Sequence, residues 1–376
     1  MRAMAAVGAD ETGCRIMAPK AVFRVLSISG LKPVQANILK QEMLAKGGEA
    51  AVSRGVITHS VPVSDVLLMG TLRQYEEVLA RLRMQPFGLA GLGDKIRKAL
   101  HSVEGRDAYR LDCRGRELVI GERTLVMGIL NITPDSFSDG GRYNSIEGAK
   151  ARALEMVDAG VDILDVGGES TRPGYTPLEV REELRRVLPV LETIAPLVPV
   201  PVSIDTCKAA VARAALDAGA NIINDQWALA DPEMAPLAAS AKAPVVMMHN
   251  RKGTDYEDLM GDIVSYFEER ISHALAAGIP AEHIIIDPGI GFAKTPLQNI
   301  EVMRRLEELN SLGFPVLIGT SRKSFIGYAL DLPVNERLEG TAASVSVGIM
   351  KGADIVRVHD VKEMVRVARM TDTLKP

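Results

Sequence analysis

The sequence predicts an α/β protein, a TIM (β/α)8 barrel preceded by a small N-terminal α/β domain. From residue 125 onward, eight short apolar runs alternate with longer amphipathic segments. The runs are apolar at consecutive positions, which is typical of parallel strands that helices cover on the outside. Eight such units in about 250 residues have the size of this barrel. A doubly wound open sheet is the competing fold, but it rarely contains so many evenly spaced units.

Each predicted strand is a short apolar run that ends in polar residues. The strands are LVMGILN (125–131), DILDVGG (162–168), VPVSIDT (200–206), NIINDQ (221–226), APVVMMH (243–249), HIIIDPG (283–289), FPVLIGT (314–320) and ADIVRVHD (353–360). Between them, apolar residues recur at helical spacing, as at Leu259, Ile263, Phe267, Ile271 and Leu275. Four predicted helices end in the turns DAGVD, DAGAN, AAGIP and KGADI, where glycine is the expected C-terminal cap.

The segments before residue 125 differ from the barrel repeat. Residues 109–124 predict a β-hairpin that turns at Gly115 or Gly121 and covers the N-terminal end of the barrel. The first hundred residues contain shorter apolar and helical patterns, at 23–28, 34–45, 50–58, 65–69 and 73–83. We therefore predict two domains, residues 1–100 and residues 109–376, of which the first carries no motif that indicates a function.

The composition excludes several classes of protein. A net charge of -4 and a pI near 6.0 lack the basic excess of a general nucleic-acid-binding protein. No stretch approaches the roughly 18 to 20 apolar residues of a membrane span, and the N-terminal segment lacks the apolar core of a secretory signal. Cys14, Cys113 and Cys207 are too dispersed for a disulfide framework or a zinc site. We expect a cytoplasmic protein that binds neither nucleic acid nor membrane.

All eight predicted strands end in hydrogen-bonding or charged residues. In a TIM barrel these ends meet at one mouth, which is where the active site lies. The residues are Asn131, Glu169-Ser170-Thr171-Arg172, Asp205, Asn224-Asp225, His249, Asp287, Ser321-Arg322-Lys323, and Arg357 with His359 and Asp360. One or two of them would mean little, because strand terminators and helix caps are also polar. Their presence on every strand predicts an enzyme.

The side chains at the barrel mouth indicate that the ligand is a flat heterocycle. Asp205, Asn224 and Asp287 supply carboxylates and an amide, which suit a ring that carries N–H, amino and carbonyl groups. Taken singly, Asp205 fits a helix cap and Asp287 fits the start of a turn equally well. Lys323 adds a cation to the same face.

A second group of residues indicates a binding site for an anion. Arg357 and His359 stand two residues apart on one strand and therefore point the same way. Loops after the last strands of a barrel often bind phosphate, although a lone histidine is more often a satisfied interior residue. Asn131 offers a neutral oxygen suited to a Mg²⁺ that bridges substrate phosphates. The glycine-rich loops at 131–141 and 167–174 would exclude water from the mouth, or merely connect elements.

Several motifs together resemble one family. They are MGILNITPDSFSDGG, DILDVGGESTRPG, PVSIDT, IINDQ, IIIDPGIGFAKT, LIGTSRKSFIG and GADIVRVHDV, in this order over about residues 109 to 376. This set resembles dihydropteroate synthase, the sulfonamide target of folate biosynthesis. The resemblance implies a transferase that condenses 6-hydroxymethyl-7,8-dihydropterin pyrophosphate with 4-aminobenzoate to give 7,8-dihydropteroate and pyrophosphate. It also implies a homodimer.

The resemblance implies a role for each matching residue. Asp205, Asn224, Asp287 and Lys323 would hold the pterin ring, with Met248 packing against it. Asn131, Arg357 and His359 would bind the pyrophosphate, with Mg²⁺ at Asn131. Thr171, Arg172, Phe292 and Ser321 would lie beside 4-aminobenzoate, and Asp135 would act with the two loops in closing the site. The residues expected to take part in catalysis are Asp135, Arg172, Lys323, Arg357 and His359.

The sequence departs from the family pattern at two places. After Asn224-Asp225 it reads Gln226-Trp227-Ala228-Leu229, where many relatives carry a small VSGL segment, and after His249 it reads NRKGTDYEDLM. Two other functions compete with the synthase. One is a methyltransferase from methyltetrahydrofolate to a corrinoid protein, which shares the pterin residues but needs no pyrophosphate site. The other is a non-catalytic pterin-binding protein.

Overall fold

The structure is a computed structural model that describes residues 2–105, 107–132, 146–169 and 178–375. The chain divides into two compact units, Met1–His101 and Ser102–Pro376. Among the described helices, none combines the length and hydropathy that crossing a membrane requires.

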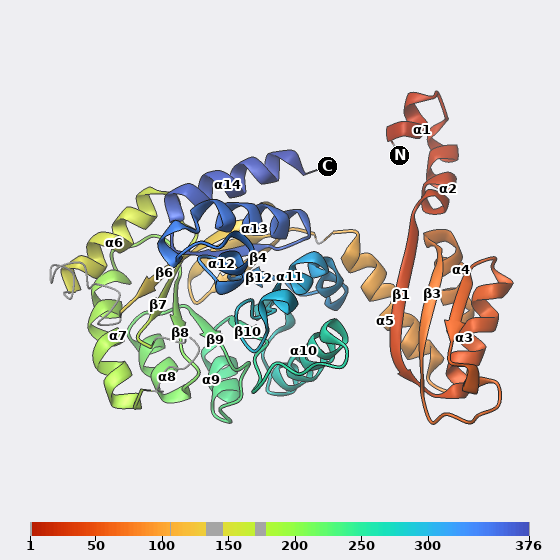
Figure 1. The fold of residues 1–376 in the computed structure, drawn as a ribbon, viewed down its shortest axis with the longest axis horizontal. Coiled ribbons are helices and arrows are strands. Elements are labelled where there is room, and N and C mark those ends of the chain that lie inside the picture. Colours follow the sequence, from red (N-terminus) through yellow and green to blue (C-terminus); the bar gives the residue numbers. More distant parts are fainter. Residues whose placement is uncertain (1, 106, 133–145, 170–177, 376) are drawn as a thin grey trace. The chain divides into compact units, whose positions relative to one another are not determined.

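The first unit is an antiparallel sheet with helices (Figure 1). Its strands β1 (Phe23–Leu31), β2 (Glu49–Val52) and β3 (Ser64–Thr71) lie in the order β1-β3-β2. The helices are α1 (Arg2–Ala6), α2 (Glu11–Ala21), α3 (Pro33–Ala45), α4 (Leu72–Leu82) and α5 (Leu89–Val103). The core contains Leu39, Met43, Leu68, Tyr75 and Leu82. The patterns at 23–28, 34–45 and 73–83 fall on β1, α3 and α4, whereas α1, α2 and α5 were not predicted.

The second unit is the predicted barrel. Its parallel strands are β6 (Leu125–Asn131), β7 (Ile163–Gly167), β8 (Val202–Asp205), β9 (Ile222–Asp225), β10 (Val245–Met248), β11 (Ile284–Asp287), β12 (Leu317–Ile318) and β13 (Ile355–Val358). They lie in the order β11-β10-β9-β8-β7-β6-β13-β12. A parallel bridge between Ile286 and Val316 joins the two ends of this order and closes the barrel. The eight strands expected from the apolar runs are therefore confirmed.

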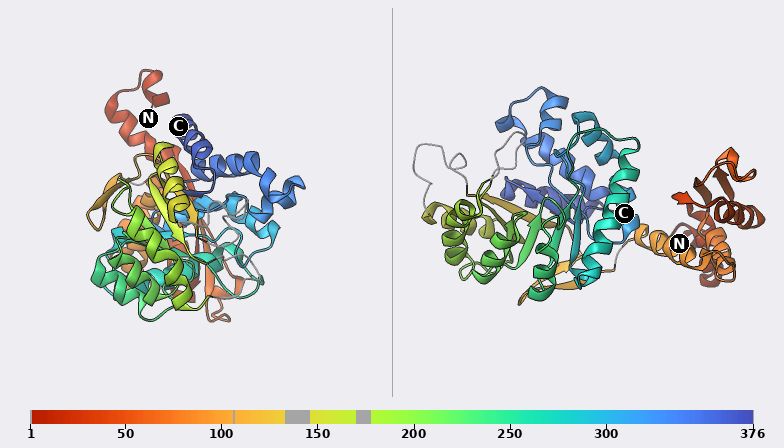
Figure 2. Two further views of the ribbon diagram at one scale, coloured as in Figure 1. Left: turned by 90° about the vertical axis from the view of Figure 1, so that its left-hand side faces the viewer. Right: turned by 90° about the horizontal axis from the view of Figure 1, so that it is seen from below.

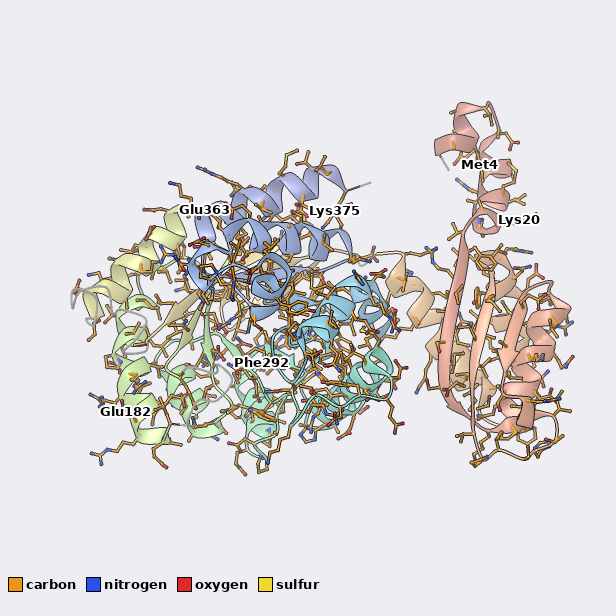
Figure 3. All side chains as sticks on the ribbon, viewed as in Figure 1. Met4, Lys20, Glu182, Phe292, Glu363 and Lys375 are labelled. Atoms are coloured by element: carbon orange, nitrogen blue, oxygen red, sulfur yellow. The ribbon has the colours of Figure 1, made fainter. Side chains whose placement is uncertain are left out.

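Helices surround the strands, as Figures 1 and 2 show. They are α6 (Ile146–Asp158), α7 (Val180–Ile194), α8 (Ala209–Asp217), α9 (Met234–Ala241), α10 (Leu259–Ala276), α11 (Pro296–Arg304), α12 (Ser324–Leu330), α13 (Leu338–Met350) and α14 (Val361–Leu374). Side chains fill the space between helices and strands (Figure 3). Every residue of β7 to β11 is buried, which is why these strands are apolar at consecutive positions.

The hairpin expected over residues 109–124 closes the N-terminal end of the barrel. Strands β4 (Tyr109–Cys113) and β5 (Arg116–Ile120) pair antiparallel and turn at Gly115, whose φ of +87° suits glycine. Leu111, Leu118 and Ile120 pack against interior residues from the beginnings of the barrel strands. Arg116 also donates to the carbonyl of Ala195, at the end of α7, at 2.6 Å. The hairpin therefore covers the N-terminal end of the barrel, and the C-terminal end is the one available for a functional site.

The helix ends and helix faces follow the predicted pattern with one exception. Gly160, Gly219, Gly278 and Gly352 all adopt positive φ after their helices, as expected of C-terminal caps. Leu275 was expected on the buried face of α10 but is 44% exposed. A stripe at constant spacing of four residues drifts around a helix of 3.6 residues per turn, so the buried face continues at Ala274 instead.

Candidate active site

The polar residues expected at the C-terminal strand ends surround one pocket. Asp205, Asn224 and Asp287 lie at the ends of β8, β9 and β11. The pocket has an empty volume of about 320 Å³ and is lined by Asp205, Asn224, Gln226, Met248, Asp287, Ile290, Phe292, Gly319, Lys323 and Arg357. Of these, Gln226, Ile290 and Gly319 were not among the predicted site residues. The barrel thus brings together residues from six strand ends, β8 to β13, and the loops that follow them.

Arg357 is a cation shared by two carboxylates. Its Nε donates to Oδ2 of Asp165 and its Nη2 donates to Oδ2 of Asp205, both at 2.6 Å. Asp165 is fully buried in the middle of β7, and the Arg357 side chain is 18% exposed. Burial lowers the pKa of Arg357, but the two carboxylates outweigh that effect and raise it above its ordinary value. The two ion pairs link β13 to β7 and β8 through the barrel interior.

Two amides extend this network and take a defined orientation from it. Nδ2 of Asn224 donates to Oδ2 of Asp165 at 3.1 Å, and Nε2 of Gln226 donates to Oδ1 of Asp205 at 2.7 Å. A carboxylate accepts hydrogen bonds only, so each amide must turn its nitrogen toward it. The oxygens of Asn224 and Gln226 are then left as acceptors.

Burial also shifts the protonation of the pocket carboxyls. It raises the pKa of Asp205, with Arg357 opposing the shift and Asp165 adding to it. Burial raises the pKa of Asp287 to about 6. The N–H of Gly289, which donates to Oδ1 at 2.8 Å, partly offsets this shift by favouring the ionised form. Carboxyls that titrate this close to neutral pH inside a pocket are typical of functional sites.

Lys323 and Phe292 form the opposite wall of the pocket. Nζ of Lys323 lies 4.0 Å from the centroid of the Phe292 ring, which is a cation–π distance. A Cβ on Gly291 would approach Cδ of Lys323 to 2.7 Å, and Gly291 has a φ of +84°. Glycine at this position therefore lets the lysine lie across the loop that carries Phe292, which is labelled in Figure 3.

The loop after β11 is held by the buried Lys294. Its Nζ contacts Nδ1 of His249 at 3.0 Å and donates to the carbonyls of Gly289 and Phe292, both at 3.2 Å. Burial lowers the pKa of His249 to about 3, so its ring is neutral and Nδ1 accepts from the lysine. Burial also lowers the pKa of Lys294, to about 7. Its three contacts fix the backbone at Gly289 and Phe292.

His359 and Ser321 lie beside the pocket, at the ends of β13 and β12. Oγ of Ser321 accepts from the backbone N–H of His359 at 3.2 Å and lies 3.0 Å from Nδ1 of the same residue. Burial lowers the pKa of His359 to about 3, with Arg357 adding to the effect, so its ring is neutral. If the serine hydroxyl donates to Nδ1, the Nε2–H of His359 is left to meet a ligand.

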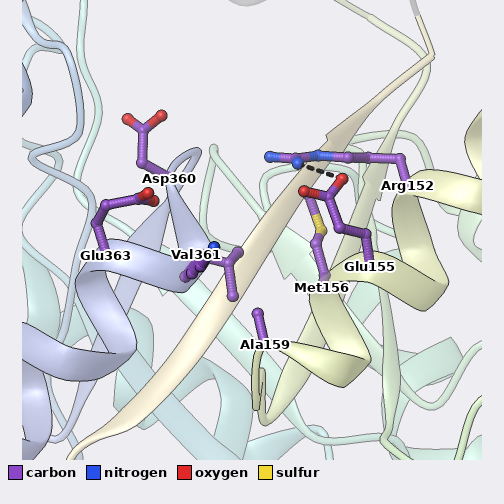
Figure 4. A pocket seen from close by; sticks show the side chains of 8 residues that line it. Arg152, Glu155, Met156, Ala159, Asp360, Val361 and Glu363 are labelled. Carbon is purple, nitrogen blue, oxygen red and sulfur yellow. Dashed lines mark hydrogen bonds and ion pairs between the residues drawn. The ribbon is translucent and has the colours of Figure 1, made fainter.

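A larger hollow lies outside the barrel mouth, between α6 and the start of α14 (Figure 4). Its empty volume is about 510 Å³. Three of its charged side chains have ion-pair partners: Arg152 pairs with Glu155 at 2.7 Å, and Asp360 pairs with Arg322. Nη2 of Arg152 also donates to the carbonyl of His359 at 3.0 Å. We therefore assign this hollow a supporting role behind His359.

Three site residues, Asp165, Gln226 and Lys294, lie within the quoted motifs but were not predicted to have a role in the site. Asp165 stands in the middle of an apolar strand, and a charge there must be paired, which was an available signal. Gln226 was visible only as a departure, and the contacts of Lys294 depend on the folded loop. Asp135, Thr171 and Arg172, which were predicted for the two mouth loops, lie outside the described residues.

No group of three or more histidine, cysteine or carboxylate side chains in the described ranges has the geometry of a metal site. Asn131, the last residue of β6, is half-buried at the mouth. A Cβ on Gly167 would lie 3.7 Å from Oδ1 of Asn131 and 3.7 Å from Oδ2 of Asp205. A neutral oxygen near a carboxylate suits a hydrated divalent cation more than a tightly held transition metal.

Comparison with known proteins gives a consistent result. Residues 127–359 match the family described as pterin binding enzyme. A dihydropteroate synthase from Clostridium beijerinckii is 55% identical over 261 residues, which cover 69% of this chain and 97% of that protein. A probable bifunctional folylpolyglutamate synthase/dihydropteroate synthase from Haloferax volcanii is 45% identical over 347 residues, which cover 88% of this chain and 41% of that protein.

Solved structures agree. The crystal structure of a dihydropteroate synthase from Clostridium difficile, in the presence of pteroic acid, aligns with a TM-score of 0.66 at 50% identity. The alignment covers 68% of this chain and 98% of that one. The barrel unit thus corresponds to nearly the whole of that enzyme.

The shared cation yields a stability prediction. Asp165→Asn is expected to lower the free energy of unfolding of the barrel unit by about 3 kcal/mol, because it leaves the charge of Arg357 buried beside only one carboxylate. Trp227 is the only tryptophan and lies in this unit, so its fluorescence during urea unfolding measures the effect. Arg185→Ala, which removes the exposed partner of Glu182, is the control and should leave the midpoint unchanged. An unchanged midpoint in Asp165→Asn would contradict the interpretation.

Proposed function

The chain belongs to the dihydropteroate synthase family of pterin-binding enzymes, and on that premise we propose how its barrel mouth performs the family's reaction. The enzyme is a transferase of folate biosynthesis. It joins 6-hydroxymethyl-7,8-dihydropterin pyrophosphate to 4-aminobenzoate and releases pyrophosphate. The observation that supports the assignment of roles is the single pocket in which Asp205, Asn224 and Asp287 face Lys323 and Arg357.

The pterin ring fits the polar wall of this pocket. Its amino group and ring N–H groups are donors, and the wall offers the carboxylates of Asp205 and Asp287 and the amide oxygen of Asn224 as acceptors. Its carbonyl and ring nitrogens are acceptors, for which Lys323 is the donor. Met248 is buried at the end of β10 and supplies an apolar surface for the ring. Substrate and side chains are thus complementary in hydrogen-bonding type.

The leaving group is bound at the side of Asn131, Arg357 and His359. During the reaction the bond from the exocyclic carbon to the pyrophosphate oxygen breaks, and the electron pair leaves with the pyrophosphate. Arg357 and the Nε2–H of His359 stabilise the charge that develops there. A Mg²⁺ held through the oxygen of Asn131 would supply Lewis-acid charge to the same oxygens.

The nucleophile is the amine of 4-aminobenzoate, which attacks the exocyclic carbon and then loses a proton. An aniline is already nucleophilic, so it needs positioning more than a strong base. Phe292 offers a ring surface and Ser321 a hydroxyl for this substrate, and Lys294 fixes the backbone of Phe292. Asp135, Thr171 and Arg172 are proposed to complete the site from the two mouth loops, on the basis of the sequence.

We also propose a homodimer in the cytoplasm. Helices α12, α13 and α14 expose large apolar side chains that a second copy would cover: Tyr328, Leu330, Val347, Met350, Met370 and Leu374. The three cysteines are all free thiols, which suits a reducing compartment.

The first test is pyrophosphate release from the purified protein, given both substrates and Mg²⁺. Release should require 4-aminobenzoate, and Lys323→Ala should lower kcat/KM for the pterin substrate about 100-fold, because it removes a charged donor from the pocket. Lys351→Ala, which loses only a surface pair with Glu307, is the control. Tight pterin binding without release would contradict the proposal and favour a non-catalytic protein. Methyl transfer from methyltetrahydrofolate would favour the corrinoid-linked alternative.

The titration of Asp287 predicts the pH dependence. Asp287 must be ionised to accept from the pterin, and its raised pKa means that protonation begins near pH 6 instead of near pH 4. The value of kcat/KM for the pterin substrate should therefore fall as the pH is lowered through about 6, since this ratio reports ionisations of the free enzyme. Asp205, whose pKa burial also raises, contributes to the same acid limb. Asp287→Asn should have low activity at every pH. An acid limb at pH 4 would show that burial does not shift this carboxyl.

The covered lengths predict that the barrel unit acts alone. The Clostridium beijerinckii relative is matched over 97% of its length by 69% of this chain, so a full synthase needs no counterpart of the first unit. A protein comprising residues 107–376 should fold and keep the kcat/KM of the whole chain for both substrates. Steady-state pyrophosphate release and Trp227 fluorescence would check activity and folding. A folded but inactive barrel would assign the first unit a role in the chemistry.

A further inference from the structure

Gln226 is a polar residue of the pocket to which the reaction outlined above gives no task. It follows β9 directly and is 8% exposed on the pocket wall. Its Nε2 donates to Oδ1 of Asp205 at 2.7 Å. The other oxygen of this carboxylate accepts from Arg357, so Asp205 is held from both sides.

The amide of Gln226 has a fixed orientation. Since its nitrogen faces a carboxylate, its Oε1 is the free end, and no hydrogen bond of Oε1 occurs within the described part of the chain. Asn224, two residues earlier, has the same arrangement through Asp165. The wall therefore presents two amide oxygens as acceptors, next to Asp205.

We propose that Gln226 is a positioning and specificity-determining residue of the pterin subsite, which holds Asp205 in its accepting orientation and offers Oε1 to an N–H of the ring. This inference rests on the proposed function. A 7,8-dihydropterin carries four N–H bonds on its amino group and two ring nitrogens. Asp287 already accepts one bond from Gly289, so additional acceptors beside Asp205 match the donors of the ligand.

The charges around Asp205 define how the contact responds to substitution. Arg357, Asp165 and Glu183 are the charged groups that act on this carboxylate. The hydrogen bond from Gln226 favours the ionised form of Asp205 and so lowers its pKa. Without this bond, burial and the charge of Asp165 raise that pKa further. A carboxylic acid in place of the amide would share one proton with Asp205, because two charges at this distance cannot both persist.

Two variants test the proposal in the whole chain. Gln226→Met keeps the length of the side chain but has no amide. It should raise the KM and the calorimetric Kd for the pterin substrate about tenfold, the effect of one lost charged hydrogen bond. The kcat and the KM for 4-aminobenzoate should not change, since a contact made equally in the bound and transition states affects KM alone.

Gln226→Glu gives a pH signature that a purely structural role would not produce. While the new carboxyl keeps its proton, it donates to Asp205 as the amide does, so pterin affinity should approach that of the parent at low pH. Affinity should fall steeply as the pH rises and the shared proton is lost, whereas the parent and Gln226→Met show no such alkaline loss. Absence of this loss overturns the proposed contact.

A control lies at the other end of the same strand. Asn221, which directly precedes β9 and does not line the pocket, is a buried amide whose oxygen accepts from the N–H of Val202. Asn221→Ala should lower the thermal midpoint without changing the KM for the pterin. If Gln226→Met likewise lowers stability and leaves KM unchanged, Gln226 is structural and the inference is wrong. Parent turnover in the same series shows that the proposed function still stands in that case, whereas a parent without turnover overturns both.

Discussion

The site depends on one buried guanidinium between two carboxylates. Arg357 reaches from β13 to Asp165 on β7 and Asp205 on β8, and each ion pair is formed at 2.6 Å. Removing these charges from water is costly, and the cost is offset only because each charge has a close partner and further hydrogen bonds. The amides of Asn224 and Gln226 supply those bonds. One cation therefore sets the direction of both carboxylates and, through them, of both amides.

Burial shifts the pKa values of the carboxyls and of the histidines of the site in opposite directions. Burial raises the pKa values of Asp205 and Asp287, whereas it lowers those of His249 and His359 to about 3. Burial thus favours the neutral acid at both carboxyls, an effect that Arg357 opposes at Asp205, and it keeps the imidazoles of His249 and His359 neutral. A pocket built for folding stability alone would hold apolar side chains here, so the retained charges indicate selection for binding.

The sequence predicted the barrel because its strands are buried on both faces and its helices on one, and burial leaves a direct trace in residue type. It also predicted the strand ends, since parallel strands share a direction. Pairing within the interior leaves a weaker trace. The charge of Asp165 in an apolar strand indicates that a partner is needed but not which one, and Gln226 acquires its contact only when β8 and β9 are placed side by side. Leu275 was misplaced because a four-residue repeat is slightly longer than a helical turn. In the first unit, α1 is short and α2 has only a weak apolar pattern, whereas Leu89, Ile96 and Leu100 do recur at helical spacing on α5, which was overlooked.

The arrangement of charges also bears on the type of catalysis. Burial lowers the pKa of Lys294 to about 7, but Lys294 does not line the pocket, and its Nζ is bonded to His249 and to the carbonyls of Gly289 and Phe292. This arrangement is consistent with the proposed direct attack by the amine of 4-aminobenzoate. In the proposed reaction the protein contributes fixed hydrogen-bonding groups: acceptors toward the pterin, donors toward the departing pyrophosphate, and a ring at Phe292 for the second substrate. Preorganised groups of this kind need no rearrangement as charge develops, which is the condition under which electrostatic stabilisation is most effective. Burial and paired hydrogen bonds hold the Arg357 network in one arrangement. The network whose desolvation is costly in folding is therefore also the one to which the proposed reaction gives a role.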